Sequence, residues 1–411
     1  MTRKINDYIS GIEVNAKPEE VFATQVFSKR LVEDYGYPKK NIQTRPQFHV
    51  KARPSDTKKE YPVDIAVFNS SKKTDKTLNI IVECKAPNIK KGRSQLETYL
   101  TLSNARIGVW FNGKEILYLL KEITKSGVLF KELPNIPLYG QRVEDLGLFK
   151  RNSLKTTHNL KSVFEEIRNY LAANNTGSTL DTELLPQVIN ILFCKIYDEK
   201  FTPPESVVQF RAGIDETDKD IAERIRALFT KVKNEYADVF SAEDQIKFTD
   251  SSIAFIASAI GMYCLCDTER DVVADAFEVF ITPSLRGGQG QFFTPRNVVK
   301  MLLEMTAPTM NDKILDPACG SGGFLVEALR YVWRSIEKEG AVLSWNSSEI
   351  ERRKTKTAES NFKGIDKESF LSKTTKAYMA ILGDGRGGVF CENSLENPKK
   401  WSKKAQYEIA D

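Results

Sequence analysis

Residues 314–329, ILDPACGSGGFLVEAL, form the stretch that decides the fold of the C-terminal part of the chain. A short apolar run ends in Asp316, a glycine-rich segment follows, and then a longer apolar segment begins. This order predicts a strand, a tight turn and a helix, because glycine lets the backbone turn sharply and approach a ligand closely. We therefore expect an α/β fold with a nucleotide-like cofactor at the turn.

Two common nucleotide-binding motifs do not fit this turn. A dinucleotide fingerprint needs glycine at position 325, which is leucine, and a phosphate-binding P-loop needs a GK[ST] sequence, which the chain lacks. Neither NAD nor ATP is therefore the expected cofactor.

The composition indicates a soluble protein with two to three domains. The chain has 411 residues, of which 41% are hydrophobic and 28% charged. No apolar run reaches the roughly 18 residues of a membrane span, and the N-terminus lacks a signal peptide, so we expect a cytoplasmic protein and no membrane partner. With only two histidines, any metal is expected to have oxygen ligands, as Mg²⁺ does.

The pattern of apolar residues divides the chain into four segments. An α/β unit is expected over 1–132, with helices at 18–36 and 93–105. Strands are expected at 42–50, 61–69, 78–86, 107–113 and 115–123. The further segments are a connector at 133–159, a helical domain at 160–285 and a second α/β segment at 286–411.

Two carboxylates and a lysine stand at strand ends in the first segment. Asp64 lies in the apolar run PVDIAVF, and Glu83 and Lys85 lie in IIVECKA after a polar turn. A period of two puts Glu83 and Lys85 on one face of the strand, and a hairpin would bring Asp64 beside them. Asp64 and Glu83 could then hold Mg²⁺ for phosphodiester hydrolysis, with Lys85 orienting water or offsetting charge.

This arrangement resembles the PD-(D/E)xK nuclease superfamily. Gln95 and Tyr99, on one face of the following helix, resemble the form in the nuclease domains of type I restriction subunits. The resemblance implies catalytic roles for both and places Glu20 on the first helix near the metal. The loop NIKKGR could contact DNA phosphates through Lys90, Lys91 and Arg93, or be an ordinary solvated turn.

The glycine-rich turn itself resembles motif I of adenine-N6 DNA methyltransferases, in the sequence DPACGSGGF. Just upstream, GQFFTPRNVV resembles their motif X, and this order of motifs is that of the gamma class, which includes type I modification subunits. The resemblance implies a Rossmann-like domain that binds S-adenosyl-L-methionine. The implied cofactor contacts are Phe293, Thr294, Pro295, Asp316, Pro317, Ala318, Gly320, Ser321 and Gly322.

Later motifs match less completely. FKGID resembles motif II, which implies that Asp366 accepts hydrogen bonds from the ribose hydroxyls. Asn393 stands in the motif III position, where the family often has aspartate, so its cofactor contact is open. Motif IV, an N-P-P-[FY] sequence that holds the flipped adenine, does not occur in these residues. We therefore expect the N-terminal part of a longer protein, with no methyl transfer by this part alone.

Together, the resemblances imply a restriction-modification enzyme of the type IIG or type I-like kind. It would be a Mg²⁺-dependent site-specific DNA endonuclease joined to an adenine-specific DNA methyltransferase that protects the cell's own DNA. The expected partners are double-stranded DNA and either a specificity subunit or a C-terminal target-recognition domain. Two alternatives stay open: a modification-only methyltransferase, and a DNA-binding or assembly module with an inactive nuclease fold.

Overall fold

The computed structural model forms two compact units, and each is described by itself. It describes residues 3–51, 60–125, 127–174, 181–268, 279–280, 294–383 and 385–410. Unit 1 comprises Met1–Asn174, Thr202–Arg224 and Thr249–Cys264, and unit 2 comprises Asn175–Phe201, Ile225–Phe248 and Leu265–Asp411. The helical segment expected at 160–285 thus contributes to both units, and the domain boundaries drawn from the sequence stay predictions.

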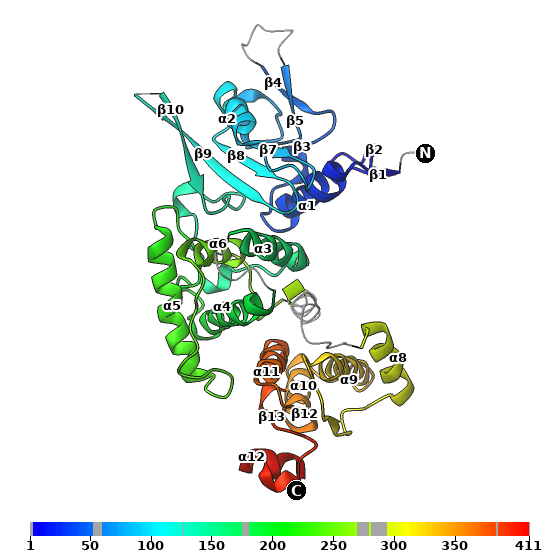
Figure 1. Ribbon diagram of the computed structural model, residues 1–411. Coiled ribbons are helices and arrows are strands. Elements are labelled where there is room, and N and C mark those ends of the chain that lie inside the picture. Colours follow the sequence, from blue (N-terminus) through cyan, green and yellow to red (C-terminus); the bar gives the residue numbers. More distant parts are fainter. Residues whose placement is uncertain are drawn as a thin grey trace. The chain divides into compact units, whose positions relative to one another are not determined.

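A mixed six-stranded sheet forms the centre of unit 1 (Figure 1). Its order is β10-β9-β8-β7-β6-β3, and all neighbours are antiparallel except β7 and β8, which are parallel. The strands are β3 (Ile42–Gln43), β6 (Ile65–Phe68), β7 (Leu78–Cys84), β8 (Ile107–Phe111), β9 (Ile116–Thr124) and β10 (Gly127–Leu133). Two short antiparallel pairs lie outside it: β1 (Lys4–Asn6) with β2 (Glu13–Asn15), and β4 (Phe48–Lys51) with β5 (Glu60–Val63).

Strands form in all five expected ranges, but 42–50 and 61–69 are each divided into two strands of different sheets, and β1, β2 and β10 were not expected. The clearest case is β10. It is an edge strand whose residues are mostly exposed, so its sequence GVLFKEL lacks the alternation of a strand with one buried face. The expected hairpin is confirmed, because Ile65 of β6 pairs with Val82 of β7.

The helices of unit 1 come from several parts of the chain, and α2 packs against the sheet. A π-helical turn (Glu20–Thr24) leads into α1 (Gln25–Glu33), and α2 (Arg93–Leu102) crosses from β7 to β8. Leu96, Tyr99 and Leu100 of α2 are buried in the core against the sheet. The other helices of this unit are α3 (Leu160–Asn174) and α6 (Asp250–Ile260).

Two buried contacts fix α1 to the helical part of unit 1. Arg30 pairs with Glu166 of α3 at 2.8 Å, and both side chains are 3% exposed. The Tyr263 hydroxyl donates a hydrogen bond of 2.9 Å to Asp34, which follows α1. The sheet and these helical segments therefore share one core.

Unit 2 contains a three-stranded parallel sheet in the order β11-β12-β13, as expected for the strand–turn–helix pattern. The strands are β11 (Ile314–Asp316), β12 (Phe362–Asp366) and β13 (Val389–Cys391). The helices assigned to the unit are α4 (Asp181–Phe201), α8 (Arg296–Thr306), α9 (Gly323–Val342), α10 (Ser347–Asn361), α11 (Ser369–Gly383) and α12 (Lys403–Ala405), while α5 (Asp218–Glu235) is divided between the units. In the described ranges, no helix has both the length and the apolar character to cross a membrane.

Candidate active sites

The structure brings Asp64, Glu83 and Lys85 together in unit 1. Asp64 stands between β5 and β6, and Glu83 is the buried next-to-last residue of the neighbouring strand β7. One Asp64 oxygen accepts the Cys84 amide at 2.8 Å, and the other accepts the Gln47 side chain at 3.1 Å. Lys85 pairs with Glu83. The hairpin thus places both carboxyls at the same end of the sheet.

Burial makes the ionised forms of Asp64 and Glu83 less favourable. Burial raises the pKa of Asp64 to about 6, although the Cys84 amide opposes the shift. Burial and then the Asp64 charge raise the pKa of Glu83 to about 7. Burial alone would lower the pKa of Lys85, but its bond to Glu83 raises it. The half-buried Asp64 and the buried Glu83 therefore share one ammonium, and a further cation would stabilise their ionised forms.

The carboxyl groups of Asp64 and Glu83 are the donors that this site offers to a metal ion. Across the described ranges, no group of three or more His, Cys, Asp or Glu side chains is arranged to hold a metal. Asp64 and Glu83 would therefore be two oxygen ligands, with water or substrate completing the shell, which is a common arrangement for Mg²⁺. The Asp64–Glu83 pair fits such an ion in chemistry and in charge.

Gln95 and Tyr99 lie on one face of α2, as the sequence predicted. The Gln95 amide donates to the Tyr99 hydroxyl at 2.6 Å. Burial raises the pKa of Tyr99, with further effects from Glu83, Lys85 and Asp64 that place the phenol in their electrostatic reach.

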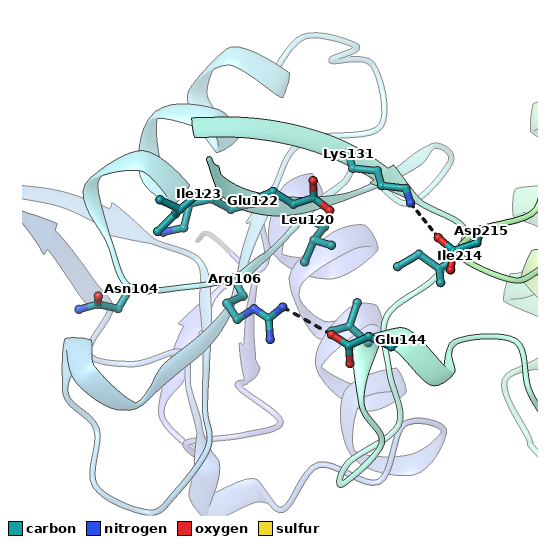
Figure 2. A pocket seen from close by; sticks show the side chains of 11 residues that line it. Asn104, Arg106, Leu120, Glu122, Ile123, Lys131, Glu144, Ile214 and Asp215 are labelled. Atoms are coloured by element: carbon teal, nitrogen blue, oxygen red, sulfur yellow. Dashed lines mark hydrogen bonds and ion pairs between the residues drawn. The ribbon is translucent and has the colours of Figure 1, made fainter. Parts of the chain in front are cut away.

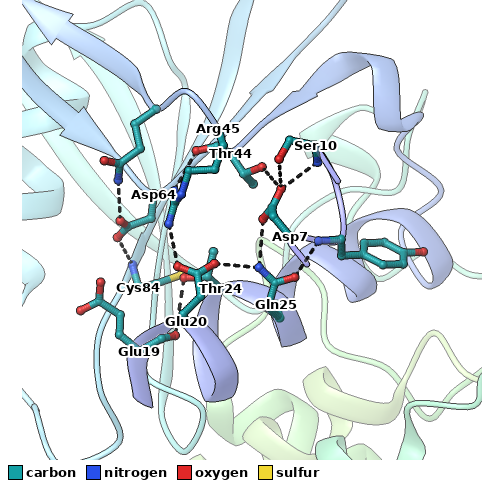
Figure 3. A network of polar contacts seen from close by, with 12 residues as sticks. Asp7, Ser10, Glu19, Glu20, Thr24, Gln25, Thr44, Arg45, Asp64 and Cys84 are labelled. Carbon is teal, nitrogen blue, oxygen red and sulfur yellow. Dashed lines mark hydrogen bonds and ion pairs between the residues drawn. The ribbon is translucent and has the colours of Figure 1, made fainter. Parts of the chain in front are cut away.

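Glu20 lies near the site but is already occupied by other residues. One of its oxygens pairs with Arg45 at 2.6 Å, and the other accepts the Gln25 amide at 2.7 Å (Figure 3). After burial, and for Glu83 also after the Asp64 charge, the charge of its neighbour Glu19 further raises the pKa values of Asp64 and Glu83. Arg45, Gln47 and Glu19 were missed by sequence reasoning; only the adjacency of Glu19 to Glu20 gave a signal.

Lys90 and Lys91 in the loop before α2 and Arg93 at its start differ in their partners. Arg93 pairs with Glu97 at 2.9 Å and with Glu132. Lys90 pairs with Glu115 at 3.4 Å, while Lys91 is exposed. Their contact with DNA phosphates stays a prediction, and the two acids bound to Arg93 would compete with a phosphate for it.

A pocket of about 520 Å³ opens elsewhere in unit 1 (Figure 2). Its opposite charges are largely paired, since Lys131 lies 3.3 Å from Asp215 and Arg106 lies 3.9 Å from Glu144. None of the residues predicted from the sequence for either site lines it. The lining residues are Asn104, Arg106, Leu120, Lys121, Glu122, Ile123, Lys131, Val143, Glu144, Ile214 and Asp215.

In unit 2 the glycine-rich turn has the geometry expected from the sequence. Gly320 and Gly322 have φ values of +55° and +86°, a region that favours glycine. The Thr375 hydroxyl of α11 donates to the Gly320 carbonyl at 2.8 Å, and the Cys319 amide donates to Ile365 at 2.9 Å. These bonds fix the turn to α11 and β12.

Two aspartates flank this turn. Asp316 ends β11 and accepts the Ala318 amide at 3.1 Å, and burial raises its pKa, as does the Asp366 charge. Asp366 ends β12 and accepts the Gly320 amide at 2.9 Å. Pro317 and Ala318 are exposed, whereas Ser321 is buried. Two carboxylates at the carboxyl ends of neighbouring parallel strands suit a ligand with hydroxyl and amino groups, as S-adenosyl-L-methionine has.

The remaining predicted cofactor contacts are Phe293, Thr294, Pro295 and Asn393. Thr294 and Pro295 are exposed directly before α8, whose Arg296 lies 3.6 Å from Glu327 near the start of α9. This ion pair connects the start of α8 to the helix that follows the turn. Asn393 uses its side-chain oxygen to accept the Leu395 amide at 3.1 Å. Phe293 lies outside the described residues.

Two family models match separate parts of the chain. Residues 18–137 match the Type I restriction enzyme R protein N terminus, and residues 268–410 match the N-6 DNA Methylase family. The first contains the carboxylate pair and the second contains the glycine-rich turn. The chain therefore carries two domains of restriction-modification proteins, an N-6 DNA methylase domain and a domain of the type I restriction-subunit N-terminal family.

Its curated relatives are proteins of such systems. The Type I restriction enzyme MjaVII methylase subunit of Methanocaldococcus jannaschii is 27% identical over 35% of this chain and 22% of its own length. The EcoKI methylase subunit of Escherichia coli is 38% identical over 15% and 12%. The Type II restriction enzyme and methyltransferase RM.BcgI of Heyndrickxia coagulans is 26% identical over 31% and 19%. The chain thus spans about a fifth or less of these relatives.

Solved structures of the same kind share weaker similarity. A type I modification subunit from Vibrio vulnificus YJ016 has a TM-score of 0.37 and 18% identity, over 61% of this chain and 59% of its own. The type IIG restriction endonuclease BpuSI has a TM-score of 0.24 and 14% identity, over 82% and 38%.

Proposed function

We propose that this chain belongs to a restriction-modification enzyme that cuts DNA with unit 1 and binds the methyl donor for adenine-N6 methylation with unit 2, in a type IIG or type I-like arrangement. The observation that carries the proposal is the pair of half-buried Asp64 and buried Glu83 with Lys85 at one sheet end, in a segment that matches a restriction-subunit family. Unit 1 would adopt the PD-(D/E)xK nuclease fold. The two functions would act on the same partner, double-stranded DNA.

In unit 1, Asp64 and Glu83 would hold Mg²⁺, which polarises the phosphodiester and favours ionisation of a bound water. Asp64 is oriented for this role by the Cys84 amide and the Gln47 side chain. Lys85 stays protonated because of its pairing with Glu83, and it can donate a hydrogen bond to a phosphate oxygen as negative charge develops there.

In unit 2, S-adenosyl-L-methionine would supply the methyl group. The turn at Gly320 and Gly322 brings the backbone close to the ligand, and Asp316 and Asp366 offer acceptors for its amino and hydroxyl groups. Selection of a DNA sequence would be the task of a specificity subunit or a target-recognition domain.

The test is a DNA cleavage assay with the chain in Mg²⁺ and in EDTA. Asp64→Asn and Glu83→Gln should each slow Mg²⁺-dependent cleavage by at least about 100-fold, because each removes a negative metal ligand. Asp75→Asn is the control, because Asp75 lies before the start of β7, whereas Glu83 lies near its end. This variant should cut DNA as the unmodified chain does. Equal cleavage by Asp64→Asn and the unmodified chain would refute the nuclease assignment.

A second candidate is a protein that only modifies DNA, favoured by the names of the methylase-subunit relatives. It predicts S-adenosyl-L-methionine binding by calorimetry with no Mg²⁺-dependent cleavage. Cleavage that Glu83→Gln abolishes would exclude this candidate.

A further inference from the structure

Arg45 lies near the Asp64–Glu83 pair but makes no hydrogen bond or ion pair with either carboxyl. It belongs to the segment between β3 and β4, two residues before Gln47, whose amide contacts Asp64. Figure 3 shows its guanidinium between Glu20 and Asp64. Both Asp64 oxygens already accept hydrogen bonds from Gln47 and Cys84. Arg45 therefore places a positive charge near Asp64 while it pairs with Glu20 and not with Asp64.

A chain of polar contacts fixes the direction of this guanidinium. Glu20 pairs with one Arg45 nitrogen at 2.6 Å, and the Thr44 carbonyl accepts from the other at 2.8 Å. Gln25 donates to Glu20 at 2.7 Å and to Asp7 at 2.9 Å. The Thr44 hydroxyl also donates to Asp7, at 2.6 Å. The arginine is thus held before any ligand arrives.

The guanidinium keeps donors to spare. Its contacts within the described part of the chain use two of the five N–H groups that an arginine has. Its side chain is 22% exposed, whereas that of Glu20 is 9% exposed. A planar guanidinium with unused donors matches the geometry of a phosphate better than that of a metal.

We propose that Arg45 contacts a phosphate of the DNA strand bound at the Asp64–Glu83 pair, and that Glu20 is the positioning residue that orients Arg45. This inference rests on the proposed nuclease function and changes the role expected for Glu20. Glu20 acts on the DNA through Arg45, not on the metal.

The first experiment measures DNA binding by the full chain in EDTA, where no cleavage occurs, over a series of salt concentrations. Arg45→Gln should reduce the slope of log affinity against log salt by about 0.9, the value for one lost phosphate contact. Arg211→Gln is the matched control, because Arg211 pairs with Glu216 at 3.0 Å with both side chains 20% exposed. A slope for Arg45→Gln equal to that of the control would overturn the proposal.

The second experiment separates the role of Glu20 from that of a metal ligand. Glu20→Gln should lower kcat/KM for cleavage in the same direction as Arg45→Gln, while the Mg²⁺ concentration for half-maximal rate stays unchanged. A rise of tenfold or more in that concentration would show that Glu20 binds the metal and would overturn its positioning role. Thermal melting of each variant confirms that it is folded.

The two proposals can fail separately. If the unmodified chain binds DNA but never cuts it, the nuclease function fails, and the salt slope still decides whether Arg45 contacts phosphate. If the chain cuts DNA and Arg45→Gln cuts it with unchanged kcat/KM, the nuclease function stands and the Arg45 contact is wrong.

Discussion

Glu83 is a carboxyl whose ionisation opposes folding. Its folded pKa of about 7 lies above the ordinary value of 4.5, so the folded state binds more protons than the unfolded state between these pH values. Stability is therefore lost as pH rises through this window. Glu83→Gln should raise the free energy of unfolding at pH 8 without metal by up to roughly 3 kcal/mol, and by less at pH 5. Denaturant titration in EDTA at both pH values measures the difference.

Glu216 provides the control of opposite sign. Burial would raise its pKa, but hydrogen bonds from Arg224 and from the Gly213 amide lower it overall. The Glu216 carboxylate therefore stabilises the fold above its unfolded pKa, and this stabilisation is lost as pH falls. Glu216→Gln should destabilise the chain at pH 8. The same direction of change for Glu83→Gln would show that the carboxylate pair is not strained.

The three central residues of the candidate site in unit 1 could be inferred from sequence because strand periodicity and one hairpin place them. Asp64, Glu83 and Lys85 lie within 22 positions, and local rules suffice to bring them together. Arg45 could not be inferred, because its direction depends on the packing of the Glu20–Thr24 turn against the segment before β4. Such contacts between distant segments leave no periodic signal.

At the scale of elements, Gly322 is one of two glycines with positive φ in the turn between β11 and α9. A Cβ atom at Gly322 would lie 3.0 Å from the Thr375 methyl group, and the backbone φ of +86° already disfavours other residues. Gly322→Val should therefore displace the turn and weaken S-adenosyl-L-methionine binding by tenfold or more. Calorimetry with the full chain measures this loss.

The adjacent glycine is the control for this variant. A Cβ atom at Gly323 would meet nothing within 4 Å, and this residue begins α9, where alanine is the better helix former. Gly323→Ala should bind the cofactor normally and melt at the same or a higher temperature. Equal weakening by both variants would mean that the cofactor needs backbone flexibility here, not the Gly322 conformation.

Elements with a strong local pattern were predicted well, and those defined by their surroundings were not. The strand–turn–helix at 314–342 and the β6–β7 hairpin follow from glycine chemistry and alternation. β10 was missed because an exposed edge strand needs no buried face. The division of α5 between two units was also missed, since helical periodicity reports a buried face but not which neighbour buries it.

On the scale of the whole molecule, the Arg30–Glu166 pair should distinguish the stability of the two units. Removal of one partner from a fully buried ion pair leaves an uncompensated charge and costs about 3–5 kcal/mol. Glu166→Gln should therefore lower the melting temperature of unit 1 while S-adenosyl-L-methionine binding by unit 2 is retained. Calorimetric melting with and without the cofactor can assign each transition.

Asp145→Asn is the control for this experiment, because Asp145 pairs with Arg142 on the surface of unit 1. The Asp145→Asn variant should leave the melting temperatures of both units unchanged. Loss of cofactor binding in Glu166→Gln would contradict the assignment of this pair to unit 1 alone.

The hydrogen bond from Tyr263 to Asp34 joins residues 229 positions apart, and this separation affects how the protein is made. A ribosome synthesises Asp34 long before Tyr263, and between them it synthesises Asn175–Phe201 and Ile225–Phe248, which belong to the other unit. Unit 1 therefore cannot fold to completion as the first domain to emerge. The nascent chain therefore holds an unfinished core until Tyr263 has been synthesised, and chaperones protect exposed apolar surface in such a period.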